Sequence, residues 1–215
     1  MRTVAFVTRK GGAGKSTLAA SLAAAAQEQK ESVVCIDLDP QQSLTSWGAL
    51  RAEELGIPVQ TCTPGRLEAL LESLERAGFT LAVIDTSAGE SPAAEAAIRA
   101  SDLTLIPCRP SMFDLLATEA TRKTVRSLRR DYAFLLNQCP PMLESARVQA
   151  GVEALEAMGG LISPLVTSRV DYQEAAKSGL GVTEYNPHGK ASEEMQGLWR
   201  SVKWRIGKAA VKKAA

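Results

Sequence analysis

A loop rich in glycines and cations lies near the start of the chain, where residues 9–17 have the sequence RKGGAGKST. Glycines let the backbone turn tightly and direct N–H groups at phosphate oxygens, and a following helix offers its positive N-terminus. The Lys15 ammonium can then reach the β- and γ-phosphates of a nucleotide, while the Ser16 hydroxyl can bind Mg²⁺. The predicted phosphate-binding residues are Gly11, Gly12, Ala13, Gly14, Lys15, Ser16 and Thr17. The alternative, a glycine-rich turn with an incidental lysine, fits less well, because the loop follows a predicted strand and opens a predicted helix.

This loop departs from the usual G-x-x-x-x-G-K-[ST] pattern at its first position. Arg9 stands where the pattern has a glycine, and a second lysine, Lys10, follows it. Two extra cations therefore lie beside the expected nucleotide. That arrangement needs an explanation beyond the binding of one nucleotide by one loop.

Two predicted buried strands end in aspartates, with Asp37 and Asp39 after one of them and Asp85 at the end of the other. A hydrolytic nucleotide site needs a carboxylate on the side of the metal and a polar group that orients the attacking water. We expect Asp85 to serve the metal together with Ser16 and Asp39, and Asp39 also to position water near the γ-phosphate. Asp37 either belongs to the site or caps the next turn. Residues 86–91 (TSAGES) are small enough to respond to a γ-phosphate, as switch loops do.

The hydrophobic pattern alternates continuous apolar strands with helices, which predicts a mostly parallel twisted sheet covered on both faces. The expected strands cover residues 3–8, 32–37, 57–62, 81–85, 103–107, 133–137 and 161–166, and the expected helices cover 16–29, 44–55, 67–77, 115–130, 146–158, 172–177 and 193–213. Ligands of such sheets bind outside the carboxyl ends of the strands, where the loop and the aspartates fall. We expect one α/β P-loop NTPase domain over residues 1–215, with a basic C-terminal helix or tail at about residues 193–215.

Positive charge is concentrated in two stretches of a chain whose net charge is only +1. Residues 122–130 contribute +5 and residues 198–215 contribute +6, so the other residues sum to −10. Such separation predicts contact with a polyanion such as DNA, although two solvated helix faces would look the same. Helical spacing predicts that the first four arginines share one face. The predicted DNA-binding residues are Arg122, Arg126, Arg129, Arg130, Arg200, Lys203, Arg205 and Lys208; Lys212 and Lys213 add charge.

Composition excludes several other classes of protein. No apolar run approaches the roughly 20 residues that cross a bilayer, and no secretory leader is recognisable, so we expect a cytoplasmic protein. The four cysteines are widely spaced and lie in or beside apolar runs, which favours small buried side chains over metal ligands or disulfides.

Four motifs in order, KGGAGKST, DLDPQ, VIDTSAG and LIPCRPSMFDL, resemble the ParA/MinD family of deviant Walker-A ATPases. The likeness is greatest to small ParA-type partition ATPases and runs across nearly the whole chain. It implies that Lys10 reaches across an ATP-sandwiched homodimer to the partner's nucleotide, in the electrostatic role of an arginine finger. It also implies that Asp39 supports hydrolysis, that Asp85 occupies the Walker-B position and that Asn137 lies near the adenine. Guanine-specific N-K-x-D is absent, which favours ATP with Mg²⁺ over GTP.

By the same resemblance, the ATP-bound dimer binds non-specific nucleoid DNA, and a ParB-like or other cargo-bound activator stimulates slow hydrolysis. A plasmid or chromosome is the first choice of cargo, and another large assembly is the second. The main alternative is a MinD-like membrane-associated ATPase, because Trp199, Val202, Ile206 and Ala210 lie near one helical face. We expect these residues to pack on the core instead, which makes membrane binding unlikely. A small-molecule synthetase with the same ATP loop is a further alternative.

Overall fold

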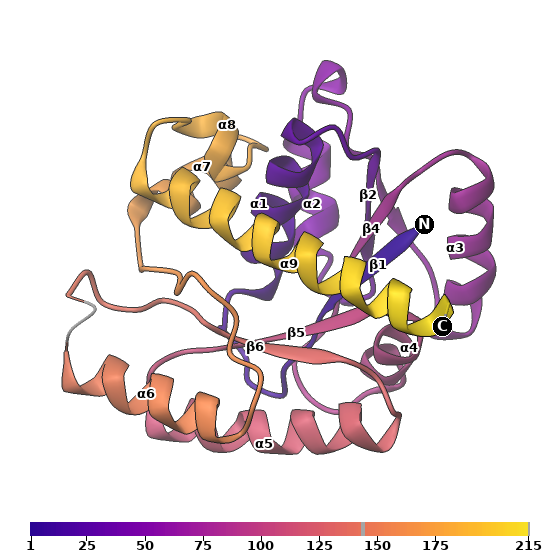
Figure 1. Ribbon diagram of the computed structural model, residues 1–215. Coiled ribbons are helices and arrows are strands. Elements are labelled where there is room, and N and C mark those ends of the chain that lie inside the picture. Colours follow the sequence, from indigo (N-terminus) through magenta and orange to yellow (C-terminus); the bar gives the residue numbers. More distant parts are fainter. Residues whose placement is uncertain (143–144, 215) are drawn as a thin grey trace.

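The protein is described by a computed structural model that covers the backbone of residues 1–142 and 145–214, with side chains as far as residue 208 (Figure 1). Its sheet has the strand order β3-β2-β4-β1-β5-β6, and all neighbouring strands are parallel. The strands are β1 (Arg2–Phe6), β2 (Val33–Asp37), β3 (Val59–Thr61), β4 (Leu81–Asp85), β5 (Leu103–Cys108) and β6 (Tyr132–Leu136). The predicted α/β class and parallel sheet are confirmed.

Helices cover both faces of this sheet, as continuous apolar strands require. Alternate residues of one strand point to opposite faces, so Cys35 packs with α1, α2, α7, α8 and α9, whereas Ile36 packs with α3, α4, α5 and α6. The helices are α1 (Lys15–Glu28), α2 (Ser43–Leu50), α3 (Leu67–Arg76), α4 (Pro92–Ala100), α5 (Met112–Ser127), α6 (Ala146–Ala157), α7 (Val170–Lys177), α8 (Val182–Tyr185) and α9 (Lys190–Ala214), with short 3-10 turns at Glu53–Leu55 and Pro64–Arg66.

The sheet register sets the spacing of the polar strand ends. Phe6, the last residue of β1, pairs with Asp85 of β4, and Asp85 also pairs with Asp37 of β2. Since all three strands are parallel, their carboxyl ends meet at one edge. The loop after β1 and the two aspartates are therefore brought together there, as the sequence predicts.

Two predicted elements differ from the structure, and two helices, α4 and α8, lie outside the predicted elements. The expected strand over 161–166 makes only isolated bridges, at Leu161 and Thr167, because Pro164 has no N–H to donate to a ladder. The expected helix over 44–55 ends at Leu50 and is followed by a 3-10 turn. Helix α4 was not predicted from its alanine-rich sequence, although Ser91 caps it by accepting a hydrogen bond from the Ala94 N–H (3.1 Å) and a proline follows the cap.

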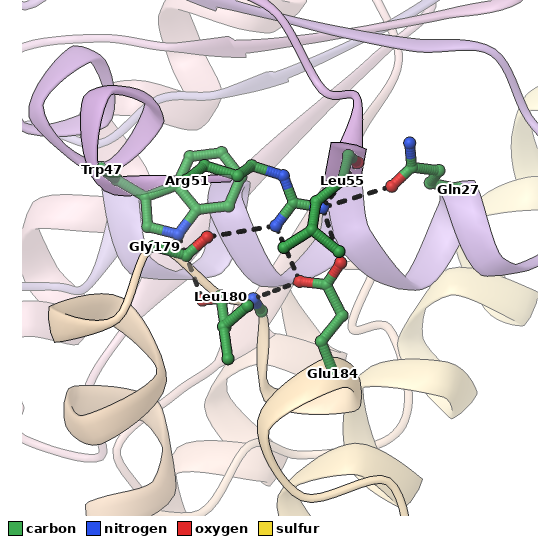
Figure 2. Close-up of polar contacts among 8 residues, drawn as sticks. Gln27, Trp47, Arg51, Leu55, Gly179, Leu180 and Glu184 are labelled. Atoms are coloured by element: carbon green, nitrogen blue, oxygen red, sulfur yellow. Dashed lines mark hydrogen bonds and ion pairs between the residues drawn. The ribbon is translucent and has the colours of Figure 1, made fainter. Parts of the chain in front are cut away.

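A buried clamp holds the helix that follows the DLDPQ segment (Figure 2). Arg51, at the end of α2, pairs with Glu184 of α8 through two hydrogen bonds of 2.8 and 2.6 Å, and its side chain is only 2% exposed. It also donates to the Gly179 carbonyl (3.1 Å), and the neighbouring Trp47 indole N–H donates to the Leu180 carbonyl (3.1 Å). The Leu55 carbonyl and the Gln27 side chain accept further hydrogen bonds from the same guanidinium. Helix α2 is thereby fixed to the C-terminal helices.

In the part of the chain with described coordinates, no helix is long and apolar enough to cross a bilayer. The four cysteines are free, and Cys35, Cys108 and Cys139 are buried, as expected of small apolar side chains. The C-terminal helix also follows expectation, because Trp199, Val202 and Ile206 are buried in the core on the α1 side of the sheet. That face of α9 is therefore not available to a membrane; the side chain of Ala210 lies outside the described residues.

Candidate nucleotide site

The glycine loop joins β1 to α1 and leaves the start of the helix open. Gly12 and Gly14 have φ values of +73° and +86°, which only glycine adopts at little cost. Gly14 is the N-cap of α1, and no side chain caps the helix there. The first N–H groups of a helix have no partner within it, so this end presents uncapped donors and a positive dipole to an anion. This geometry supports the phosphate cradle, which stays a prediction.

Two side chains behind the loop hold it in place. The Asn137 amide donates to the Ala13 carbonyl (2.8 Å), and the Gln138 amide donates to the Gly12 carbonyl (3.0 Å). A Cβ on Gly14 would lie 2.6 Å from the Asn137 amide nitrogen, so the close approach requires glycine. Asn137, predicted to lie near the adenine, is thus seen to support the loop, a role that the sequence did not reveal; its contact with adenine stays a prediction.

Lys15 and Asp85 form the buried centre of the site. Burial lowers the pKa of Lys15, which is 8% exposed, while the nearby charges of Asp85 and Asp39 act to raise it. Asp85 is fully buried, and burial raises its pKa to about 7 against the opposing effects of the Ser16 hydroxyl and the Lys15 charge. One oxygen, Oδ1, accepts the Thr86 N–H (3.0 Å), but Oδ2 has no partner among the described residues. An orphaned carboxylate oxygen beside Ser16 fits a hydrated cation.

The two aspartates after β2 have different surroundings. Asp37 accepts hydrogen bonds from the Asp39 N–H (3.0 Å), the Thr45 N–H (2.8 Å) and the Thr45 hydroxyl (2.9 Å). Its carboxylate thereby caps the first turn of α2. The sequence left two roles open for Asp37, and the geometry favours this capping role. Asp39 is half-buried near Lys15, and its carboxylate accepts only the Gln41 N–H (3.0 Å) among the described residues. Its other oxygen is available to water.

A second set of charges lies on the outer side of the loop. Arg109, which follows β5, has a guanidinium nitrogen 4.0 Å from the position that a Cβ on Gly12 would take. The same guanidinium binds Asp114 through hydrogen bonds of 2.9 and 3.3 Å. Burial acts to raise the pKa of Asp114, but hydrogen bonds from Arg109 and Ser111 and the charges of Arg109 and Lys10 hold it below its usual range. Asp114 is therefore bound by Arg109 and is also influenced by the charge of Lys10.

Arg109 and Asp114 lie within the LIPCRPSMFDL motif, but sequence reasoning gave them no individual role. Their separation of five residues across a strand end and a helix start was the available signal, since opposite charges at that spacing can pair. Next to them, Met112, Phe113 and Leu116 at the start of α5 are largely exposed. Contiguous exposed apolar side chains are typical of a surface that another molecule covers.

Arg9, the residue in place of the first glycine, turns away from the loop. Its backbone N–H donates to the Thr121 hydroxyl (3.3 Å), and its guanidinium pairs with Glu90 (2.8 Å) in the TSAGES segment. These residues border a cavity of about 300 Å³ between that segment, α4 and α5. Arg9 thus ties the segment to α5, and only Lys10 of the two added cations stays beside the loop.

The predicted DNA-binding residues do not form two uniform faces. The prediction that Arg122, Arg126, Arg129 and Arg130 share one helical face is wrong, because α5 ends at Ser127 and Arg129 adopts a left-handed conformation. Arg122 turns back onto its own protein, where it binds Glu119, the Tyr132 hydroxyl and the Met158 carbonyl. On α9, Lys203 pairs with Glu31, Lys208 stacks on Trp204, Arg200 borders a depression that contains Glu193 and Glu194, and Arg205 donates to the Tyr132 carbonyl. The side chains of Lys212 and Lys213 lie outside the described residues.

Comparisons with known proteins agree with this geometry. A family model described as the CobQ/CobB/MinD/ParA nucleotide binding domain matches residues 4–206. Maintenance of carboxysome distribution protein A of Gloeobacter kilaueensis is 32% identical over 211 residues, which cover 94% of this chain and 92% of that protein.

Two solved structures share the fold at low sequence identity. MinD in the MinC:MinD cell division complex of Aquifex aeolicus superposes with a TM-score of 0.82 at 16% identity, over 95% of this chain and 96% of that one. MinD of Pyrococcus horikoshii complexed with Mg-ADP superposes with a TM-score of 0.74 at 18% identity, over 97% of this chain and 98% of that one. The fold is therefore that of P-loop ParA/MinD ATPases.

Proposed function

Because the chain belongs to the CobQ/CobB/MinD/ParA nucleotide-binding family, we propose that it is an ATPase that positions a large cargo by cycling between ATP-bound dimers and monomers. The observation that carries the proposal is the convergence of three features at one sheet edge. These are the uncapped start of α1, the buried Lys15 and the orphaned oxygen of Asp85. Together they offer donors for phosphates, a positive charge for the terminal phosphate and a partner for hydrated Mg²⁺.

The residues divide the work of hydrolysis among them. The α1 N–H groups and Lys15 bind the phosphates, and Asp39 orients the attacking water through its free oxygen. Ser16 and the phosphates would hold Mg²⁺, Asp85 would accept hydrogen bonds from its bound water, and the ion would neutralise part of the phosphate charge. Over the described residues no cluster of three or more His, Cys, Asp or Glu could hold a metal by itself. The ion is therefore expected to arrive with the nucleotide.

Lys10 is the residue that would make two copies necessary. It is partly exposed on the outer side of the loop, where its charge acts on Asp114. The exposed apolar side chains Met112, Phe113 and Leu116 lie nearby, at the start of the helix that carries Asp114. We propose that a second copy covers this surface in the ATP-bound state and that each Lys10 contacts the partner's γ-phosphate. Such a cation stabilises charge in the transition state only when the dimer is assembled.

The proposed cycle also involves DNA, an activator protein and a cargo. The ATP-bound dimer is proposed to bind nucleoid DNA without sequence preference, and a ParB-like or other cargo-bound activator is proposed to accelerate slow hydrolysis and so release the dimer. The chain would then be cytoplasmic and associated with the nucleoid. The name of the Gloeobacter relative concerns carboxysome distribution, which supports a large protein assembly as cargo alongside a plasmid or chromosome.

Sizing the protein with ATP, with ADP and without nucleotide tests this proposal. We expect ATP with Mg²⁺ to produce a dimer and ADP to leave a monomer, and ATP turnover to rise on random duplex DNA with an activator. A near-complete shift requires ATP to favour the dimer over ADP by several kcal/mol. Binding to anionic liposomes without DNA binding would favour the membrane alternative, and a phosphorylated or amidated metabolite product would favour a synthetase.

A further inference from the structure

The two basic stretches of the sequence meet at the start of the edge strand β6. Arg126, Arg129 and Arg130 come from the end of α5 and the turn after it, and Arg205 comes from α9. With Asp131 and Gly160 they border an open depression of about 470 Å³, which we call the arginine hollow. Helices α5 and α9 cover opposite faces of the sheet, but β6 lies at its edge, so side chains from both faces can meet there (Figure 1).

The positive charge of the arginine hollow is larger than the negative partial charge of the helix ends beside it. Its four arginines and one aspartate give a net charge of +3. Helices α5 and α6 both end beside it, and each C-terminus carries a partial charge of about −0.5, or about −1 in all. An excess of about two positive charges remains after the helix dipoles are offset. Neither Arg126 nor Arg129 forms a salt bridge with any residue that the structure describes.

The backbone at Arg129 determines how the end of α5 presents this side chain. The Arg129 N–H donates to the Arg126 carbonyl (3.0 Å), and the Arg130 N–H donates to the Val125 carbonyl (3.1 Å). This is the Schellman pattern of a helix end, whose left-handed position is usually glycine. Here arginine occupies it, with φ of 54°. Lys30 ends α1 in the same conformation with the same two backbone hydrogen bonds, so the left-handed position presents the Arg129 side chain without singling it out.

The position of the arginine hollow separates it from the nucleotide site. Tyr132 begins β6, whereas the phosphate loop follows the end of β1, and the two strands run in the same direction. The hollow therefore lies where the parallel strands begin, which we call the amino edge of the sheet. The nucleotide site lies where the strands end, at the carboxyl edge. A dimer formed across the nucleotide edge would leave two arginine hollows accessible.

We propose that the arginine hollow binds the phosphate backbone of duplex DNA. The inference rests on the proposed function and locates its DNA contact in four of the eight residues suggested by the sequence: Arg126, Arg129, Arg130 and Arg205. A wide, open depression with several guanidinium groups suits a repeating row of phosphates. A membrane surface fits less well, because no large apolar side chain described as exposed lines the hollow.

This placement gives ATP a way to control DNA binding without touching DNA. One hollow binds only a few phosphates and is weak at physiological salt. Two hollows in one dimer bind the same duplex together, because the second binding event is intramolecular once the first has occurred. Dimerisation at one edge of the sheet would then switch DNA binding on at the other.

The test compares two double variants that each remove two positive charges. Arg126→Gln with Arg129→Gln alters the arginine hollow, and Arg200→Gln with Lys203→Gln alters the predicted residues that lie elsewhere. Binding of the wild type and both variants to a random-sequence duplex is measured with ATP across a series of salt concentrations. We expect the first variant to bind at least about tenfold more weakly, with a salt slope reduced by about 0.9 for each phosphate that the protein no longer neutralises. The second variant should bind within about twofold of wild type.

The outcomes separate this inference from the proposed function. If the wild type forms an ATP-dependent dimer and binds DNA but the hollow variant binds equally well, or the control is weakened as much, the inference is wrong and the proposed function stands. If the wild type dimerises without binding DNA, the proposed DNA partner falls as well. Binding of the wild type to phosphatidylglycerol vesicles in place of DNA would overturn the inference in favour of lipid.

A single substitution guards against an effect of misfolding. Arg129→Gly removes one guanidinium and supplies the residue that a left-handed helix end prefers. We expect its melting temperature to match or exceed that of the wild type while DNA affinity falls by several-fold. A variant that keeps full DNA affinity would contradict the proposal directly.

Discussion

The carboxyl edge and the amino edge of the sheet differ in how far carboxylates offset their positive charges. At the carboxyl edge, Lys15 lies near Asp85 and Asp39, Arg109 pairs with Asp114, and the charge of Lys10 also acts on Asp114. In the arginine hollow at the amino edge, four arginines and a single aspartate line one depression. Carboxylates offset the cations at the carboxyl edge, so ligand binding there is expected to depend on geometry, whereas the excess positive charge of the arginine hollow favours a polyanion. This contrast suggests a selective nucleotide site at one edge and a non-selective surface at the other.

The largest effect is expected where geometry alone controls the chemistry. Asp39→Ala removes the half-buried carboxylate that is free to orient water and leaves the phosphate loop intact. We expect ATP turnover to fall by about 10²- to 10⁴-fold, while ATP binding persists and the dimer stays on DNA. Single-turnover kinetics with sizing on DNA measures both. Unchanged turnover would show that Asp39 does not position the water.

The buried clamp behind the carboxyl edge tests whether α2 must be held rigidly. Arg51→Ala leaves Glu184 buried without its partner, which costs about 3–5 kcal/mol of the free energy of unfolding. The matched control, Arg99→Ala, breaks an exposed pair with Glu95 and should cost no more than about 0.5 kcal/mol. Urea denaturation measures both variants. Equal losses of stability would mean that the clamp contributes no more than a surface pair.

Asp37 tests the division of labour between the two aspartates after β2. Asp37→Ala removes the acceptor of the Thr45 N–H and should lower the free energy of unfolding by about 1–2 kcal/mol. ATP affinity should change little, because the carboxylate faces α2. Calorimetry and nucleotide titration read the two quantities separately. A loss of nucleotide affinity with no change in the free energy of unfolding would show that Asp37 belongs to the nucleotide site.

The smallest effect is expected at Arg109, where one of several cations is removed. Arg109→Gln should weaken ATP binding by about three- to tenfold and ADP binding less, because the guanidinium faces the outer side of the loop at Gly12. Titration with both nucleotides provides the comparison. An equal loss of affinity for ATP and ADP would place Arg109 away from the terminal phosphate. It would also mean that charge, and not only geometry, controls nucleotide binding at the carboxyl edge.

The sequence predicted the sheet edge and the phosphate loop because both have local signals. A strand, a glycine turn and Lys15 follow one another within a few residues, and Asp37 and Asp85 end apolar strands. It gave no role to the Arg109–Asp114 pair, although their separation of five residues was a local signal. It did not predict the support of the loop by Asn137, since that interaction depends on how β5 and β6 lie against β1. Long-range pairing of this kind leaves no periodic pattern in the chain.

The basic residues also show that sequence pattern does not predict where side chains meet in the fold. Helical spacing placed Arg122 with Arg126, but the left-handed Arg129 ends the helix, and Arg122 turns to Glu119 and Tyr132. The pattern of charges could identify two basic stretches but not their convergence. Arg205 joins the hollow because it donates to the Tyr132 carbonyl at the start of β6, a contact that only the tertiary fold provides.

Mixing two inactive variants tests most directly whether the nucleotide is shared between copies. In a dimer of one Lys10→Ala and one Asp39→Ala subunit, the site that keeps Asp39 receives Lys10 from its neighbour, and the other site lacks both. Subunits mixed in equal amounts before ATP is added should therefore recover about a quarter of the wild-type turnover, because about half of the dimers are mixed and each holds one intact site. Turnover no greater than the sum of the two variants measured separately would show that Lys10 serves its own nucleotide, and would contradict the account.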